Sequence, residues 1–68
     1  MVVINGKQEE ATGLTVMDYL TKTGFNPLRV VVEINYEIIP KEKLSEHILN
    51  DGDVVEILNF VGGGWFDF

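Results

Sequence analysis

The sequence predicts a single small α+β domain, in which one main helix packs on one face of a mixed sheet of four to five strands. Three observations favour this fold class. Runs of β-branched residues meet turn signals in both halves of the chain, and one segment between them carries helix start and stop signals. A length of 68 residues allows only one small core.

The first segment is predicted to form a β-hairpin. Residues 2–4 are β-branched and lead into Asn5-Gly6, a pair that tolerates the positive φ angles of a type I′ turn. Residues 7–11 should form the return strand, and Thr12-Gly13 then interrupts the pattern.

A helix is predicted after this hairpin. Thr15 and Asp18 have the spacing of a capping box, so the helix should start at Thr15. Gly24 stands where a left-handed C-terminal cap belongs, and the helix should therefore end near Thr23. The residues expected on its buried face are Val16, Met17 and Leu20.

Two further strands are predicted in the middle of the chain. Residues 30–35 follow a turn at Asn26-Pro27 and have the β-branched density of a central strand. Tyr36 falls at a tight bend. Residues 37–39 should form a short strand that Pro40 stops, because proline cannot donate to a strand ladder.

The last part of the chain is predicted to end in a strand. Residues 41–48 should form a helical turn or loop anchored by Leu44 and Ile48, and Asp51-Gly52 makes a tight turn. Residues 54–61 are expected to be the final strand. Its side chains should alternate, with Val55 and Ile57 on one face and Leu58 and Phe60 on the other.

This order of elements is compact when the first and last strands run parallel at the centre of the sheet, which is the ubiquitin-like β-grasp arrangement. One face of the sheet then has no helix. Apolar residues on that face, including Leu58 and Phe60, are either ordinary exposed hydrophobic residues or a docking patch. The residues predicted to form the core are Val16, Leu20, Val30, Val32, Ile34, Val55 and Ile57.

Composition excludes several classes of function. Eleven acidic and five basic residues give a net charge of −6, which repels phosphate backbones and anionic membrane surfaces, so neither nucleic acid nor a membrane is an expected partner. The chain has no cysteine for a disulfide or thiolate site. No apolar run approaches the roughly 20 residues of a membrane span, and we expect a cytoplasmic monomer.

The only histidine, His47, is expected to be a surface or hinge residue, and no metal site or catalytic side chain is predicted.

Three consecutive glycines, Gly62, Gly63 and Gly64, are not explained by packing. Glycine has no side chain to bury and has the largest entropy cost of folding of any residue type. One interpretation is a frayed chain end. The other is a flexible tail, residues 62–64, which enters a narrow site on another protein with its backbone close to the walls.

Five segments of the chain match, in composition and spacing, the pattern of a known protein family. They are Asn5-Gly6, residues 34–40 (Ile-Asn-Tyr-Glu-Ile-Ile-Pro), residues 46–48 (Glu-His-Ile), residues 51–53 (Asp-Gly-Asp) and residues 60–64 (Phe-Val-Gly-Gly-Gly). Together they resemble the ThiS family of bacterial sulfur carriers in thiamine biosynthesis. The resemblance covers nearly the whole chain and places the family's terminal Gly-Gly on Gly63 and Gly64.

The resemblance implies a protein cosubstrate and not an enzyme. It implies that the Gly64 carboxylate is adenylated by an E1-like, ThiF-type activating enzyme that uses ATP, and that a sulfur-donating enzyme helps convert it to a thiocarboxylate. The thiocarboxylate then gives its sulfur to thiazole synthase. The carrier itself would bind no cofactor. Gly62 and Gly63 would be recognised in the tail channel, and the residues expected to dock the partner are Leu58, Phe60 and Val61.

Two features depart from the family pattern. Tyr36 stands where the family often has glycine, so the bend either changes type or holds a left-handed non-glycine residue. Residues 65–68 (Trp-Phe-Asp-Phe) follow Gly64, so the domain of residues 1–64 would carry an extension that a protease removes. The alternatives are a carrier for molybdopterin synthase or another sulfur pathway, and a non-catalytic interaction module that binds through its intact aromatic tail.

Overall fold

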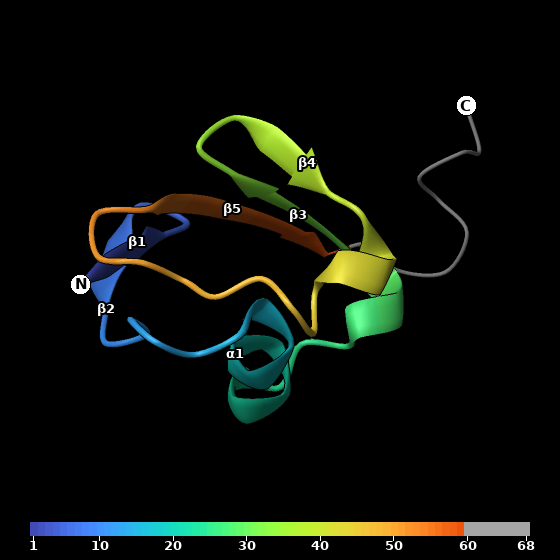
Figure 1. Cartoon of the computed structure of the whole chain (residues 1–68). Helices are drawn as coiled ribbons and strands as arrows, with labels where there is room; N and C mark the ends of the chain where they lie inside the picture. Colours follow the sequence, from blue (N-terminus) through green and yellow to red (C-terminus); the bar gives the residue numbers. More distant parts are fainter. Residues whose placement is uncertain (60–68) are drawn as a thin grey trace.

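The computed structural model describes residues 1–59, and these have the predicted architecture of one mixed sheet with one main helix (Figure 1). The sheet has five strands in the order β2-β1-β5-β3-β4. At its centre β5 (Val54–Asn59) runs parallel to β1 (Val2–Ile4) and antiparallel to β3 (Val30–Ile34). The edge strands are β2 (Lys7–Glu9) and β4 (Glu37–Ile39). The prediction that the first and last strands are parallel neighbours is therefore confirmed.

The helix α1 (Val16–Thr23) begins where the sequence predicted, and its first N–H groups all find partners. The Asp18 N–H donates to the Thr15 side-chain oxygen at 3.1 Å. The N–H groups of Val16 and Met17 donate to the carbonyls of His47 and Leu44, both at 2.9 Å. Because the first turn of a helix lacks internal acceptors, the loop that contains His47 and Leu44 completes the start of α1.

The C-terminal end of α1 is also as predicted. Gly24 has a φ of 88°, the left-handed conformation that glycine adopts without steric cost. The Gly24 N–H donates to the Thr21 carbonyl at 3.4 Å, and the Phe25 N–H donates to the Leu20 carbonyl at 2.9 Å. These two bonds form a Schellman motif, which ends the helix and turns the chain back toward the sheet.

One core lies between α1 and the sheet. All seven predicted core residues are buried there, and Leu20 has no exposed surface. The helix covers one face of the sheet only (Figure 1). The core also contains buried residues that were not predicted to be part of it: Val2, Ile4, Ala11, Tyr19 and Leu49. Leu44, predicted as an anchor of the loop after β4, is buried as expected.

The prediction that Ile48 anchors this loop is wrong, because Ile48 is 51% exposed and Leu49 is buried in its place. The backbone here is extended and pairs with the segment before α1. Gly13 donates to the Leu49 carbonyl, Leu49 donates to the Leu14 carbonyl, both at 2.8 Å, and Thr15 forms a bridge with Ile48. Successive side chains of extended backbone alternate in direction, so only one of the two residues can face the core.

Two predicted strand boundaries also change, and one of them is the end of β3, which lies at Ile34 and not at residue 35. The return strand ends at Glu9 and not at residue 11, because the Ala11 N–H bonds back to the Glu9 carbonyl at 3.0 Å and the Ala11 methyl turns into the core. Short 3₁₀ turns form at η1 (Pro27–Arg29) and η2 (Lys41–Lys43). For the final strand, residues 60–61 of the predicted range lie outside the described residues.

Candidate functional site

The candidate site begins at Asn59, the last described residue of β5, which the glycine-rich segment follows in the sequence. Asn59 pairs with Val30 of β3, so β5 is held in register to its described end. Gly62, Gly63 and Gly64, predicted to carry the chemistry, lie outside the described residues, as do the predicted docking residues Phe60 and Val61. The structure therefore defines the base from which this segment extends.

Asn5 fastens β5 close to this end. It has a φ of 50° and Gly6 has a φ of 83°, as the predicted type I′ turn requires. The Asn5 side-chain oxygen accepts the Ile57 N–H at 2.8 Å, and its amide nitrogen donates to the Ile57 carbonyl at 3.3 Å. The side chain thus extends the parallel β1–β5 ladder by one more pair of hydrogen bonds.

Asn35 fastens the other end of β5. Its side-chain oxygen accepts the Val54 N–H at 3.0 Å, and its amide nitrogen donates to the Asp53 carboxylate at 3.1 Å. The second oxygen of Asp53 accepts the Asn50 N–H at 2.9 Å. Sequence analysis identified Asn5 and Asn35 as turn residues and missed this role, because each partner is distant in the sequence.

Tyr36 completes the turn after β3 in a left-handed conformation with a φ of 71°, and Asn35 has a φ of 51°. The bend therefore does not avoid the missing glycine by changing type, and Tyr36 is a left-handed non-glycine residue, which is a strained conformation. The Tyr36 side chain is 90% exposed and therefore gains little from packing at this position.

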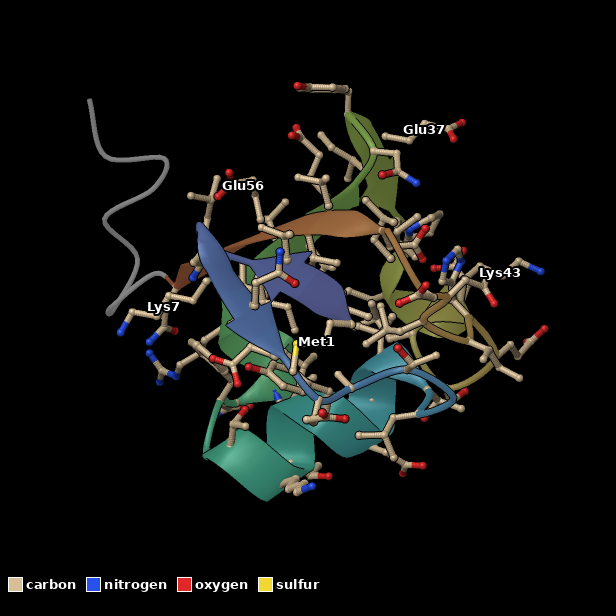
Figure 2. The ribbon with its side chains drawn as sticks, turned by 90° about the vertical axis from the view of Figure 1, so that its left-hand side faces the viewer. Met1, Lys7, Glu37, Lys43 and Glu56 are labelled. Atoms are coloured by element: carbon tan, nitrogen blue, oxygen red, sulfur yellow. The ribbon has the colours of Figure 1, made fainter. Side chains whose placement is uncertain are left out.

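The face of the sheet opposite α1 mixes apolar and acidic side chains. Leu58 is 49% exposed and pairs with Val31, which confirms that Leu58 lies on the face away from the core. Glu56 pairs directly with Glu33 and points to the side opposite α1 (Figure 2). We call this surface the open face, and its described residues are Val3, Gln8, Val31, Glu33, Ile38, Val54, Glu56 and Leu58.

The residues around His47 line a hollow on the surface of the described structure. Among residues 1–59, no group of three or more histidine, aspartate or glutamate side chains could hold a metal ion. A shallow, open hollow of about 260 Å³ is lined by Ile39, Pro40, Lys43, Glu46 and His47. His47 is half-buried at its edge, and its backbone carbonyl accepts the Val16 N–H at the start of α1 at 2.9 Å.

The electrostatic shift resolved in the described part of the chain belongs to Tyr19 in the core. Burial of the Tyr19 ring raises the pKa of its hydroxyl above the ordinary value, and the nearby negative charge of Glu9 raises it further. The neutral phenol is favoured in both cases, so this group supplies no base at neutral pH. No helix in residues 1–59 has the length and apolar character required to span a membrane.

Fold and site together define a small β-grasp domain whose central strand is followed in the sequence, after two intervening residues, by a run of three glycines. Known proteins of this kind match the chain closely. The model of the ThiS family matches residues 2–64. A crystal structure of a thiamine biosynthesis protein (ThiS) from Geobacter metallireducens superposes with a TM-score of 0.72 at 33% identity, covering 93% of this chain and 97% of that one. The chain belongs to the ThiS family.

Of two relatives found by sequence, one matches this chain over its whole length and the other over only part of its length. The sulfur carrier protein ThiS of Bacillus subtilis is 45% identical over 67 residues, which cover 94% of this chain and all of that protein. A thiazole synthase of Paramagnetospirillum magneticum is 41% identical over 64 residues, which cover 93% of this chain. The chain spans about a fifth of the length of that thiazole synthase, 20%.

Proposed function

We propose that this chain is a sulfur carrier for the thiazole ring of thiamine, and that its working group is the C-terminal carboxylate of Gly64. The observation that carries the proposal is the position of β5, which lies between two strands, is fastened at both ends by asparagine side chains, and precedes the glycine run in the sequence. The match to a sulfur carrier protein over its whole length supports the same role.

The chemistry of a sulfur carrier requires no catalytic side chain in the carrier domain. A carboxylate is a poor electrophile, so an activating enzyme of the E1-like, ThiF type first lets a Gly64 oxygen attack the α-phosphorus of ATP, and pyrophosphate leaves. The acyl adenylate has a good leaving group, so hydrosulfide delivered by a donor enzyme can attack the acyl carbon, lose its proton and displace AMP, which leaves the thiocarboxylate. The resulting thiocarboxylate is the sulfur source for thiazole synthase. The chain is a substrate of these enzymes.

We assign docking of the activating enzyme to the open face near the end of β5. Leu58 presents an apolar side chain there, and Phe60 and Val61 continue the chain from β5 toward the glycines. An activating enzyme has to hold the domain while the tail reaches the nucleotide, and an apolar patch next to the point of exit provides that hold. Gly62 and Gly63 would pass through a channel too narrow for a Cβ atom.

The working form ends at Gly64, so residues 65–68 are a removable extension of the domain formed by residues 1–64. In the longer form Gly64 is tied into a peptide bond with Trp65, and no glycine carboxylate is present to attack ATP. A protease of the host would produce the active end.

The native C-terminus tests the proposal directly. Intact mass measurement on protein purified from its own host should show a chain ending at Gly64, with a fraction heavier by the difference between one sulfur and one oxygen atom. The heavier fraction should disappear when the activating enzyme is deleted. A chain that always retains residues 65–68 would contradict a sulfur carrier and would instead favour an interaction module that binds through its aromatic end.

A further inference from the structure

Of the asparagines in the chain, only Asn5 is followed by a glycine, and an asparagine–glycine pair is the sequence most prone to spontaneous deamidation. Deamidation requires the backbone nitrogen of the following residue to reach the asparagine Cγ atom. Glycine has no Cβ to obstruct that approach. Every other asparagine precedes a residue with a side chain, and Pro27 after Asn26 has no N–H at all.

The reaction consumes water and releases ammonia. The Gly6 nitrogen forms a bond to the Asn5 Cγ and gives up its proton, the bond from Cγ to Nδ2 breaks, and ammonia leaves, which closes a succinimide ring. Water then opens the ring. Cleavage between the nitrogen and Cγ gives aspartate, whereas cleavage between the nitrogen and the main-chain carbonyl carbon gives isoaspartate, in which the backbone gains a CH₂ group.

Steric cover does not protect this pair of residues. Asn5 and Gly6 are both exposed, so water has access to the site of reaction. Within residues 1–59, no atom beyond the chain neighbours of Gly6 lies within 4 Å of the position that a Cβ of Gly6 would occupy. The nucleophile is therefore open to its target, and any protection has to come from the asparagine itself.

Both polar atoms of the Asn5 side chain are bonded to a neighbouring strand. The Oδ1 atom accepts the Ile57 N–H at 2.8 Å, and the Nδ2 atom, which is the leaving group of deamidation, donates to the Ile57 carbonyl at 3.3 Å. The Asn5 backbone N–H also donates to the Val55 carbonyl at 2.9 Å. Asn5 is thus held to β5 by its backbone and by its whole amide group.

We propose that Asn5 is a deamidation site that the fold protects through its two side-chain bonds to Ile57, and that it reacts when β5 separates from β1. Attack by the Gly6 nitrogen requires Cγ to turn toward Gly6 and Nδ2 to depart, and the bonds to Ile57 oppose both movements. Loss of two net hydrogen bonds lowers the population of the reactive arrangement by about tenfold or more.

The products of the reaction cannot restore the contact. At neutral pH an aspartate at position 5 has two acceptor oxygens and no donor for the Ile57 carbonyl, so oxygen faces oxygen across the strands. Isoaspartate lengthens the turn that sets the register of the β1–β2 hairpin. Deamidation therefore records an opening of β5 irreversibly, and it leaves the strand that precedes the glycine run less firmly held than before.

The first test measures the rate of deamidation at Asn5 by peptide mass mapping at fixed pH and temperature. The folded chain is compared with the same chain unfolded in urea. A peptide of residues 1–10, which lacks Ile57, is followed in both solutions and shows whether urea itself changes the chemistry. Asn26 is the internal control, because the nitrogen of Pro27 has no proton to give up.

The folded chain should deamidate at Asn5 at least about tenfold more slowly than the unfolded chain and the peptide, while Asn26 stays unmodified in all samples. Equal rates in the folded chain and the peptide would overturn the inference, because the bonds to Ile57 would then give no protection.

The second test compares Asn5→Asp with Asn26→Asp by urea denaturation. Both variants replace an amide by a carboxylate, and aspartate tolerates the left-handed backbone of position 5 as asparagine does. The Asn26 side-chain oxygen accepts the Leu28 N–H at 2.9 Å, a bond that a carboxylate keeps, whereas the Asn5 amide also donates.

Asn5→Asp should raise the equilibrium constant for unfolding about tenfold or more, because the Ile57 carbonyl loses its donor. Asn26→Asp should change it by less than about threefold, since asparagine and aspartate are similar helix caps. Equally small changes in the two variants would show that the deamidated side chain still holds β5, and this result would also overturn the inference.

Discussion

Asn5 and Asn35 each have a left-handed backbone and a side-chain amide that bonds β5, and they do so toward opposite ends of this strand. Each tolerates a left-handed backbone, as its φ of 50° or 51° requires, and each uses its amide to bond β5 across a turn. Glycine would satisfy the first requirement only. The conformational part of this role could be predicted from the Asn-Gly pair, whereas the partner could not, because Ile57 is 52 positions away from Asn5.

Asn5→Gly isolates the side-chain bonds, because glycine keeps the backbone conformation without strain. We expect the free energy of unfolding to fall by about 1–3 kcal/mol, the cost of leaving the Ile57 N–H and carbonyl without their partner. Chemical denaturation measures it. Asn50→Gly is the control, since the Asn50 side chain makes no hydrogen bond within the described residues. Equal losses in both variants would show that the Asn5 amide is not the cause.

Tyr36→Gly should raise the free energy of unfolding. A left-handed non-glycine residue costs about 1–2 kcal/mol, and the extra backbone entropy of glycine cancels about 0.5–1 kcal/mol of the relief. A net gain of up to about 1 kcal/mol is expected because the 90% exposed ring has little packing to lose. Denaturation of the variant beside Tyr36→Phe, which keeps the strain, measures it. A loss of stability in Tyr36→Gly would mean that the ring contributes to the fold.

At the scale of elements, α1 was predicted almost residue by residue while the loop after η2 was not. The start and end of α1 are set by local chemistry, the Thr15 side chain and the left-handed Gly24, and such signals are visible in the sequence. Leu49 is buried in place of Ile48 because of pairing with the distant segment around Leu14. A loop without periodicity gives no sequence signal for such pairing.

Leu20→Ala tests the packing of α1 on the sheet. The fully buried side chain leaves a cavity when truncated, and we expect a loss of about 2–5 kcal/mol in the free energy of unfolding. Leu28→Ala is the matched control, since Leu28 is 80% exposed and should change stability by less than about 0.5 kcal/mol. Urea denaturation of both variants gives the comparison. Similar values for the two leucines would contradict the assignment of the buried helix face.

Leu58→Glu tests the open face as the docking surface of β5. In a chain ending at Gly64 it should weaken binding to a matched activating enzyme about tenfold or more, because a charge replaces an apolar contact, while the melting temperature changes little. Ile48→Glu is the control, because Ile48 is 51% exposed and Leu58 is 49% exposed. Phe60→Glu should behave like Leu58→Glu. Unchanged affinity together with a lowered melting temperature would place these side chains in the core and refute the docking role.

At the scale of the whole molecule, the β-grasp could be predicted because the order of elements leaves few compact arrangements. The strand order with β5 at the centre is one of these few compact arrangements. The candidate site was only partly accessible in this way. The glycine run is visible in the sequence, but the bond from the Asn35 side chain to the start of β5 is not, because its partner Val54 lies 19 positions further along the chain.

The extension after Gly64 gives a prediction about the complete chain. Protein that retains residues 65–68 should give no ATP–pyrophosphate exchange with a matched activating enzyme, and protein ending at Gly64 should exchange. Adenylation needs a free carboxylate, and the terminal carboxylate of the long form belongs to Phe68, whose aromatic side chain does not suit a channel shaped for glycine. Both forms are checked by mass before the assay. Exchange by intact long-form protein would show that a group other than the Gly64 carboxylate is activated.

The central place of β5 also bears on protein synthesis. The β1–β2 and β3–β4 hairpins are joined within the sheet only by β5, which the ribosome makes after all the others. A nascent or prematurely ended chain therefore has two separate hairpins and no completed sheet, and isolated two-stranded hairpins are marginally stable in water. Folding has to wait for the segment that leads into the tail. Every molecule with a completed sheet has therefore been translated at least as far as Asn59, the last residue of β5.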